Sequence, residues 1–281
     1  MPHTKEGRVG KARQTPNRRV EARDKLRPLV ERTNGLNIQE FISRYMTSAT
    51  GAEQQTPDKS SSRDKSPAPA EPSQDSSRIP PRLDVYSAAS ISSADLEACL
   101  DLIELTSSEA YSNSGIGWSR PKKRKEMELP DMKYLILRDA EPSAASRESA
   151  GNDADSPDGA LSAPGKNKNP DAAENGRVVG FLSFMVTYED GKEVVYCYEI
   201  HLAPEARGRG LGGLLMSRME EIGRVIGLEK AMLTVFRSNE KARQFYTRGG
   251  YEVDEYSPQP RRLRNGTIKE FDYLILSKRL R

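Results

Sequence analysis

A stretch rich in glycine and arginine, residues 207–213, lies between a strand-like run at 194–202 and a helix-like run at 214–226. Glycine lets the backbone come close to a bound anion, and the first turn of a helix presents unpaired N–H groups at the positive end of its dipole. The combination predicts a site for phosphate groups. The residues expected to bind them are Arg207, Gly208, Arg209, Gly210, Leu211, Gly212 and Gly213.

The spacing within this stretch argues against two common kinds of phosphate site. A nucleoside-triphosphate loop requires Gly-Lys followed by Ser or Thr, and the stretch contains no lysine. A dinucleotide fingerprint is formally present as Gly208, Gly210 and Gly213. Its acidic residue should follow the next strand, whereas Glu229 precedes the strand predicted at 231–236, so this interpretation is disfavoured.

A third pattern is an arginine followed at fixed spacing by two glycines, at Arg207, Gly210 and Gly212. It resembles the pyrophosphate loop of the GCN5-related acetyltransferases, the GNAT superfamily. The resemblance implies that acetyl-CoA is the acetyl donor. It also implies the GNAT acyl-CoA N-acyltransferase fold, in which helices flank a mixed, mostly antiparallel central sheet. No metal is expected, because two histidines, His3 and His201, offer too few ligands for a usual zinc site.

The order of the predicted elements indicates an α+β fold. Antiparallel strands come first and helices then alternate with strands, which places the glycine-rich loop near the middle of the sheet. Strands are predicted at 83–91, 133–138, 178–188, 193–202, 231–236, 251–255 and 271–277. Helices are predicted from a Ser92 cap through Ala110, at 214–226, and from a Ser238 or Asn239 cap to Arg248.

Composition divides the chain into a folded domain and polar additions. Residues 1–47 are predicted to form a basic, partly helical N-terminal arm, and 48–81 a disordered linker. The acetyltransferase-like domain is expected at 82–281. Residues 140–176 contain almost no large apolar side chain, which predicts a disordered insertion between two strands of a hairpin.

Charge and cysteine content bear on partners and compartment. The chain has 44 basic and 41 acidic residues, and its basic arm lacks interleaved aromatic residues, so no direct nucleic-acid partner is expected. The run Arg-Pro-Lys-Lys-Arg-Lys at 120–125 is either a nuclear-import signal or the solvated first turn of a short helix. Cys99 and Cys197 are far apart, and the sequence has no secretory signal or long apolar run. These features predict a soluble intracellular protein without a membrane partner.

A closer resemblance rests on strings outside the glycine-rich loop. They read Val-Tyr-Cys-Tyr-Glu-Ile at 195–200, Met-Leu-Thr-Val-Phe at 232–236 followed by Asn239, and Tyr-Leu-Ile-Leu-Ser at 273–277. Together with the segment 111–127, they resemble the NatD family of histone-specific N-terminal acetyltransferases. The resemblance extends from about residue 83 to the C-terminus, apart from the predicted insertion.

The NatD resemblance implies a reaction, a substrate and a set of site residues. Acetyl would pass from acetyl-CoA to the α-amino group of the serine that opens the Ser-Gly-Arg-Gly tails of histone 4 and histone 2A. The implied partner is thus a histone N-terminal tail, and we expect a monomer in the nucleus and cytoplasm. Besides the glycine-rich loop, the implied coenzyme-binding residues are Ile200, His201, Leu202 and Asn239. The implied tail-binding residues are Tyr111, Glu189, Tyr198, Thr234 and Tyr273. One acidic tail-binding position of the family is Thr187 here.

Two residues are expected to carry the proton transfers. Glu199 matches the family's proposed general base, which requires burial and neighbouring tyrosines to raise its pKa toward neutrality. On a regular strand Glu199 would face away from Tyr198, and a β-bulge would change this. Tyr246 is expected to protonate the leaving thiolate, or else to be a core aromatic residue. Cys197 is interpreted as a buried filler rather than a nucleophile, and His201 as a sheet residue rather than a proton carrier.

Two other functions remain open on the sequence alone. One is a GNAT acetyltransferase that acts on lysine side chains or small amines. The other is a non-catalytic GNAT module that acts in chromatin through its basic arm.

Overall fold

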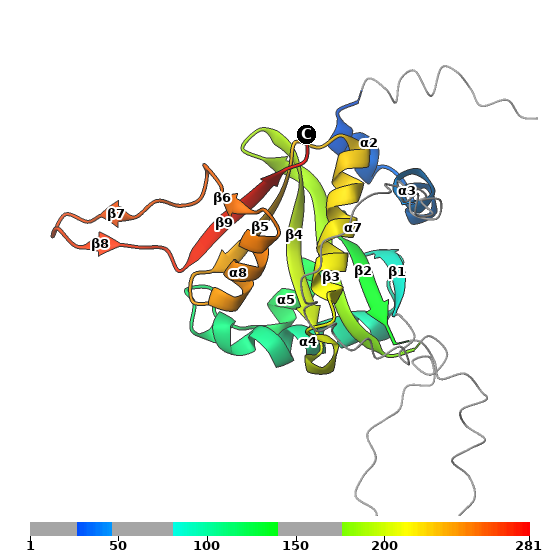
Figure 1. The fold of residues 1–281 in the computed structure, drawn as a ribbon, viewed down its shortest axis with the longest axis horizontal. Helices are drawn as coiled ribbons and strands as arrows, with labels where there is room; N and C mark the ends of the chain where they lie inside the picture. Colours follow the sequence, from blue (N-terminus) through cyan, green and yellow to red (C-terminus); the bar gives the residue numbers. More distant parts are fainter. Residues whose placement is uncertain (1–26, 47–80, 140–175) are drawn as a thin grey trace, which may run out of the picture.

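A computed structural model describes residues 27–46, 81–139 and 176–281 of the chain (Figure 1). The predicted linker at 48–81 and the predicted insertion at 140–176 lie outside the described residues, except for the last residue of each. Most of the predicted arm, residues 1–26, lies outside them as well.

A seven-stranded sheet forms the centre of the described domain, in the order β1-β2-β3-β4-β5-β9-β6. The strands are β1 Arg82–Ser87, β2 Lys133–Arg138, β3 Val178–Glu189, β4 Lys192–Leu202, β5 Lys230–Phe236, β9 Tyr273–Arg279 and β6 Glu252–Val253. Strands β4 and β5 pair in parallel, and every other neighbouring pair in this sheet is antiparallel. The predicted α+β architecture with a mixed, mostly antiparallel sheet is confirmed.

The two strands on either side of the predicted insertion are antiparallel neighbours. Strand β2 pairs with β3, and the N–H of Asp139 donates to the carbonyl of Arg177 at 3.0 Å just beyond the ladder. The intervening residues therefore connect the two strands of one hairpin.

Helices cover both faces of the sheet. On one face lie α4 Ser93–Ser112, whose N-cap Ser92 accepts from the N–H of Asp95, and α5 Arg120–Met127. On the other face lie α7 Leu211–Ile226 and α8 Glu240–Arg248, the latter capped by Asn239. Gly223 of α7 lies so close to the sheet that a Cβ atom there would be 3.0 Å from Val195. Because Gly223 lies near the end of α7 and Val195 near the start of β4, the helix runs antiparallel to the strand, and the start of α7 lies toward the end of β4.

Two N-terminal helices, α2 Leu29–Asn34 and α3 Ile38–Tyr45, also pack on the domain. The Phe41 side chain of α3 is fully buried, and its ring lies 6.4 Å from that of Phe184 on β3. The side-chain amide of Asn34 donates to the Val186 carbonyl at 2.9 Å. These helices therefore complete the hydrophobic core.

Several predicted element boundaries were wrong. Strand β1 ends at Ser87 because Ser90 closes a turn there, with its N–H donating to the Ser87 carbonyl. The predicted strand 251–255 is two residues long, and the predicted strand 271–277 lies at Tyr273–Arg279. The loop between them forms an exposed hairpin, β7 Arg261–Arg262 with β8 Ile268–Lys269, that projects from the domain (Figure 1). Among the described residues, no helix has the length and apolar character needed to cross a bilayer.

Candidate active site

Strands β4 and β5 separate midway along β4. Their pairing runs from Val194 opposite Lys230 to Cys197 opposite Leu233, whereas β4 continues to Leu202. The Ala203 N–H donates to the Val179 carbonyl of β3, so alternation along the strand turns the backbone groups of Ile200 and Leu202 toward the opposite, open edge. The Leu202 carbonyl accepts from Nε of Arg207 at 3.2 Å, and the separation leaves the backbone groups of Ile200 open in the middle of the sheet, as expected for a site that binds an extended ligand.

A β-bulge lies where the two strands separate. On β3 the register shifts between Ser183, opposite Glu199, and Phe184, opposite Cys197, which leaves Tyr198 as the extra residue of β4. The extra residue reverses the alternation that follows, so Glu199 and His201 face α4 and α5, while Leu202 faces α7. The bulge considered from the sequence is therefore present, and it decides the face on which Glu199 lies.

The glycine-rich loop connects β4 to α7 and leaves its backbone donors free. Gly208 and Gly210 have φ angles of +73° and +75°, and Gly210 is the N-cap of α7. The first N–H of this region to bond within the helix is that of Leu214, which donates to the Gly210 carbonyl. Among the described residues, the N–H groups from Gly208 to Gly213 have no backbone partner. A Cβ at Gly208 or Gly210 would meet no atom within 4 Å, so the space in front of these groups is open.

These features fit the diphosphate of acetyl-CoA. The free N–H groups at a helix N-terminus bind anions, and the exposed Arg207 and Arg209 add positive charge. A groove continues from the loop along the open edge of β4 to α8, and Phe245 approaches to 3.3 Å from the position of a Cβ at Gly212. The predicted coenzyme-binding residues that line this groove are Ile200, His201, Leu202, Arg207, Gly208, Gly212 and Asn239. Asn239 uses its side-chain oxygen to cap α8.

Glu199 is the centre of a buried polar cluster. Its Oε1 accepts from the Tyr111 hydroxyl and from the Lys123 Nζ, each at 2.7 Å. Its Oε2 lies 2.6 Å from Nε2 of His201. Lys123 also donates to Glu126 at 2.9 Å. Only 6% of the Glu199 side chain is exposed, so these contacts take the place of water.

The cluster lowers the pKa of Glu199, contrary to the sequence-based expectation. Burial alone raises the pKa of this carboxyl group, but the hydrogen bond and charge of His201 and the charge of Lys123 outweigh burial and bring the pKa to about 2. The expectation considered burial and tyrosines only. It was wrong because it left out His201 and Lys123, which contact the carboxylate and lie outside the segment 195–200.

Lys123 belongs to the candidate site and was not predicted from the sequence. It belongs to the basic run at 120–125, which does form a short helix, but its side chain is only 9% exposed and points into the site. Arg120 of the same run pairs with Glu97, Asp101 and Glu104 of α4. The run therefore forms the short helix considered from the sequence, with Pro121, Lys122 and Lys125 exposed, but the buried Lys123 departs from that interpretation. Its one sequence signal is the spacing of Lys123 and Met127, which places both on the buried face of α5.

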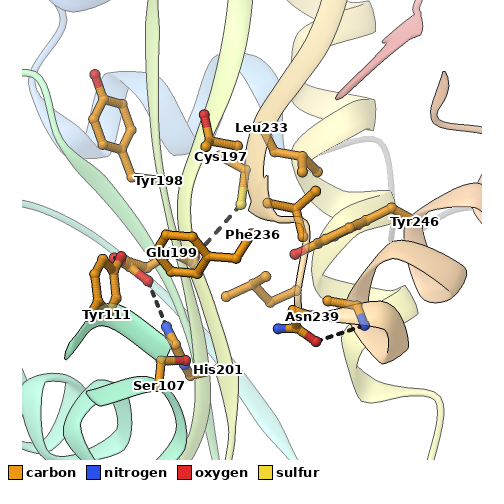
Figure 2. A pocket seen from close by; sticks show the side chains of 14 residues that line it. Ser107, Tyr111, Cys197, Tyr198, Glu199, His201, Leu233, Phe236, Asn239 and Tyr246 are labelled. Carbon is orange, nitrogen blue, oxygen red and sulfur yellow. Dashed lines mark hydrogen bonds and ion pairs between the residues drawn. The ribbon is translucent and has the colours of Figure 1, made fainter. Parts of the chain in front are cut away.

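The pocket beside Glu199 lies at the separation of β4 and β5. Figure 2 shows Tyr111, Glu199 and His201 on one side of it and Tyr246 with Asn239 on the other. Three of the predicted tail-binding residues, Tyr111, Tyr198 and Thr234, line the same pocket. The Thr234 hydroxyl hydrogen-bonds with that of Tyr196 at 2.5 Å.

The other two predicted tail-binding residues lie outside this pocket. Glu189 ends β3, four residues after Met185, which pairs with Tyr196 of β4, so strand alternation puts Glu189 on the same face as Tyr196. The Tyr196 ring lies 5.5 Å from that of Tyr198. Tyr273 begins β9 opposite Phe236 of β5, which does line the pocket. Neither residue lines the pocket itself.

Two further side chains define the pocket's chemistry. Burial raises the pKa of the Tyr246 hydroxyl, which keeps it protonated, and no described residue hydrogen-bonds with it. Burial also raises the pKa of the Cys197 thiol, which donates to the Glu199 carbonyl at 3.7 Å. A protonated thiol is a poor nucleophile, so Cys197 is a packing residue.

The fold and the glycine-rich loop define the described domain as a GNAT fold, and comparison with known proteins agrees. Residues 133–251 match the model of the acetyltransferase (GNAT) family. This range contains β2 to α8, and hence both the bulge and the glycine-rich loop.

Similar proteins include two from microbes. The chain is 32% identical over 85 residues to the uncharacterised N-acetyltransferase YhfO of Bacillus subtilis, covering 30% of this chain and 57% of that protein. It is 33% identical over 84 residues to the uncharacterised N-acetyltransferase MJ1207 of Methanocaldococcus jannaschii, covering 29% of this chain and 37% of that protein. The match thus spans about half or less of these relatives.

Solved structures with a similar fold include two acetyltransferases. Arabidopsis thaliana NAA60, in complex with a bisubstrate analogue, has a TM-score of 0.44 and 14% identity, with 70% of this chain and 98% of that chain covered. Spermidine N-acetyltransferase from Vibrio cholerae, in complex with CoA and spermine, has a TM-score of 0.42 and 14% identity, with 70% and 95% covered.

Proposed function

We propose that this protein transfers an acetyl group from acetyl-CoA to an amine, and that the amine is the α-amino group of a Ser-Gly-Arg-Gly histone tail. The observation that carries the acetyl-transfer proposal is the position of Glu199. Its buried carboxylate lies at the bulge where β4 leaves β5, beside a groove that begins at six free backbone N–H groups. The tail specificity is proposed from the NatD-like strings and from the residues around the pocket.

In the proposed reaction the amine attacks the thioester directly. An α-amino group has a pKa near 7.7–8, so part of it is charged at neutral pH and must lose a proton first. Glu199 is the nearest carboxylate to the pocket and takes this proton, directly or through water. The Ile200 N–H, on the open edge two residues after the bulge, is placed to stabilise the charge that develops on the thioester oxygen.

The leaving thiolate requires a proton from the other side of the pocket. Tyr246 lines both the pocket and the groove, and its hydroxyl remains protonated at neutral pH. It is therefore the proposed general acid. Since Cys197 is a buried, protonated thiol, the proposal includes no acetyl-cysteine intermediate.

Recognition of the tail depends on shape and on one charge. The rings of Tyr111 and Tyr198 narrow the pocket, which suits the glycines of the tail. Glu189 forms no ion pair with the described residues, and Asp190 follows it in the turn, so both can pair with the arginine of the tail. Thr187 supplies no charge, so the proposed arginine site depends on these two carboxylates.

A peptide competition tests this proposal. The full-length protein is incubated with acetyl-CoA and peptides that begin Ser-Gly-Arg-Gly or Ser-Gly-Glu-Gly and also contain lysines, and mass spectrometry locates the acetyl group. We expect α-amino acetylation of the first peptide at least about tenfold faster, because the second places a carboxylate beside Glu189. Equal rates would contradict the histone assignment, and acetyl-lysine would favour a side-chain acetyltransferase. Glu189→Gln should reduce the preference for arginine.

A further inference from the structure

His201 has a hydrogen-bond partner at each ring nitrogen. Its Nε2 lies 2.6 Å from Oε2 of Glu199, and its Nδ1 lies 2.6 Å from Oγ1 of Thr106 on α4. The Thr106 Oγ1 is also 2.7 Å from the carbonyl of Leu102. A threonine hydroxyl has one proton, so it donates to His201 or to Leu102, but never to both at once.

These contacts satisfy two charge states of the ring without moving a heavy atom. When His201 is neutral, Nε2–H donates to the Glu199 carboxylate and Nδ1 accepts from the Thr106 hydroxyl. When His201 is protonated, Nδ1–H donates to Oγ1, and the hydroxyl turns to the Leu102 carbonyl. Rotation of one hydroxyl thus accompanies each proton gained or lost.

The groups that face this pair come from every element around it. From α5 and α4, Lys123 and Tyr111 contact the other oxygen of Glu199, and Glu126 partly neutralises Lys123. From β3 the Phe181 ring stacks on the imidazole at a centroid distance of 5.6 Å. From α8 and β4, Tyr246 and Cys197 line the pocket as neutral side chains. Among these kinds of side chain, only imidazole has an unperturbed pKa that changes its charge between pH 5 and 8.

We propose that His201 is a positioning residue whose protonation state sets the capacity of Glu199 to accept the substrate's proton. With His201 neutral, the carboxylate has one cationic neighbour, Lys123. With His201 protonated, the carboxylate lies between two cations, and proton transfer from the amine to Glu199 becomes less favourable. This inference rests on the proposed acetyl transfer, and it assigns to the His201 side chain a role beyond lining the coenzyme groove.

The pH dependence of kcat tests the inference. His201→Gln retains an N–H donor for Glu199 but has no group that gains a proton in this range. Both enzymes are measured with the same peptide at saturation, so that titration of the peptide's amine affects them equally. We expect the ratio of kcat for His201→Gln to kcat for the wild type to rise about tenfold as the pH falls from 8 to 5.5. A constant ratio would overturn the proposal.

Variants at Thr106 provide a second test that leaves His201 in place. Thr106→Val removes the acceptor that the protonated ring requires, so the loss of kcat at acid pH should move to lower pH. Thr106→Ser keeps the hydroxyl and should restore the wild-type profile. If kcat of Thr106→Val fell at the same acid pH as kcat of the wild type, the proposed coupling between His201 and Glu199 would be contradicted.

A measurement without turnover separates this inference from the proposed function. The chain has two histidines, so NMR of the imidazole signals of the full-length protein gives two titrations, and His201→Gln assigns them. In Glu199→Gln the His201 titration should move to lower pH, because the protonated ring loses its carboxylate partner. If the wild type transfers no acetyl group, the proposed function fails. If the His201 titration is unchanged in Glu199→Gln, the coupling is overturned whether or not the protein is an acetyltransferase.

Discussion

At the scale of single residues, the charge of Glu199 is the result of two opposing effects. Burial raises the pKa of this carboxyl group, and the contacts with His201 and Lys123 lower it to about 2. Because the pKa lies below the ordinary value of 4.5, Glu199 stays ionised throughout the physiological range. A carboxylate of this kind is a weak base, so its role in proton transfer depends on neighbours that can change their charge.

The same shift predicts how acid affects stability. Since the folded-state pKa is depressed, the cluster stabilises the protein above about pH 4.5, and the stabilisation is lost as the pH falls toward about 2. The difference of about 2.5 pH units corresponds to on the order of 3 kcal/mol. Urea unfolding at a series of pH values should therefore show a shallower loss of stability below pH 5 in Glu199→Gln than in the wild type. If the free energy of unfolding fell equally steeply with pH in both proteins, the lowered pKa of Glu199 would be contradicted.

Tyr246 allows a test of the proposed general acid. Tyr246→Phe removes one hydroxyl that has no described hydrogen-bond partner, so we expect a normal fold and kcat about 100-fold lower, with unchanged CoA affinity. Tyr251→Phe is the matched control, because that ring is also buried, 6.0 Å from Tyr246, and lines neither the pocket nor the groove. Equal kcat values for the two variants would remove Tyr246 from the mechanism.

At the scale of elements, the site is built where regular structure ends. Strand β4 leaves its partner β5 after Cys197, and helix α7 begins with donors that have no intrahelical acceptor. The first feature opens the sheet, and the second places positive charge at one end of the opening. Helix α7 packs antiparallel on β4, with Gly223 against Val195, so the start of the helix lies toward the open end of the strand.

A pair of glycine variants separates binding from backbone strain at the two ends of α7. Gly210 and Gly227 have φ angles of +75° and +93°, so alanine at either position should cost about 1–2 kcal/mol of stability. Only Gly210 lies in the predicted diphosphate site. Calorimetry should therefore show CoA binding about tenfold weaker in Gly210→Ala and unchanged in Gly227→Ala. A similar Kd for the two variants would place the diphosphate elsewhere.

At the scale of the whole molecule, the described core includes a segment distant in sequence. Helices α2 and α3 precede β1, with residues 47–80 between, yet Phe41 of α3 lies against Phe184 of β3. The capping box of Asn37 and Glu40 begins α3, and Phe41 and Tyr45, four residues apart, lie on its buried face. The N-terminal helices are thus part of the structure that supports β3, the strand opposite the bulge.

This packing predicts a large effect of a substitution far from the site. Phe41→Ala should lower the free energy of unfolding by about 3–5 kcal/mol, because it leaves a cavity between α3 and β3. Gln39→Ala, on the exposed face of the same helix, should change it by less than about 0.5 kcal/mol. Thermal and urea unfolding measure both, and equal stability would mean that α3 does not pack on the sheet in solution.

The sequence alone was sufficient to predict those features that depend on neighbours in the chain. Glycine spacing predicted the loop before α7, Ser92 and Asn239 predicted helix caps, and alternating apolar residues predicted the order of the main strands. These signals are local, because capping, turns and strand periodicity involve residues a few positions apart. The edge strand β6 was predicted three residues too long, and the β7–β8 hairpin was missed, since the pairing of such short strands is weakly patterned.

Only the tertiary structure decided the electrostatics of the site. The bulge that turns Glu199 toward α4 and α5 is a matter of register between β3 and β4. Lys123, which then meets Glu199, is 76 positions away in the sequence and belongs to a run that reads as surface charge. Charge interactions depend on distance in space and on burial, and neither quantity is contained in the spacing of residues along the chain. For that physical reason the sequence determined that a carboxylate lies on the strand before the predicted phosphate site, and the fold determined the electrostatics of that carboxylate.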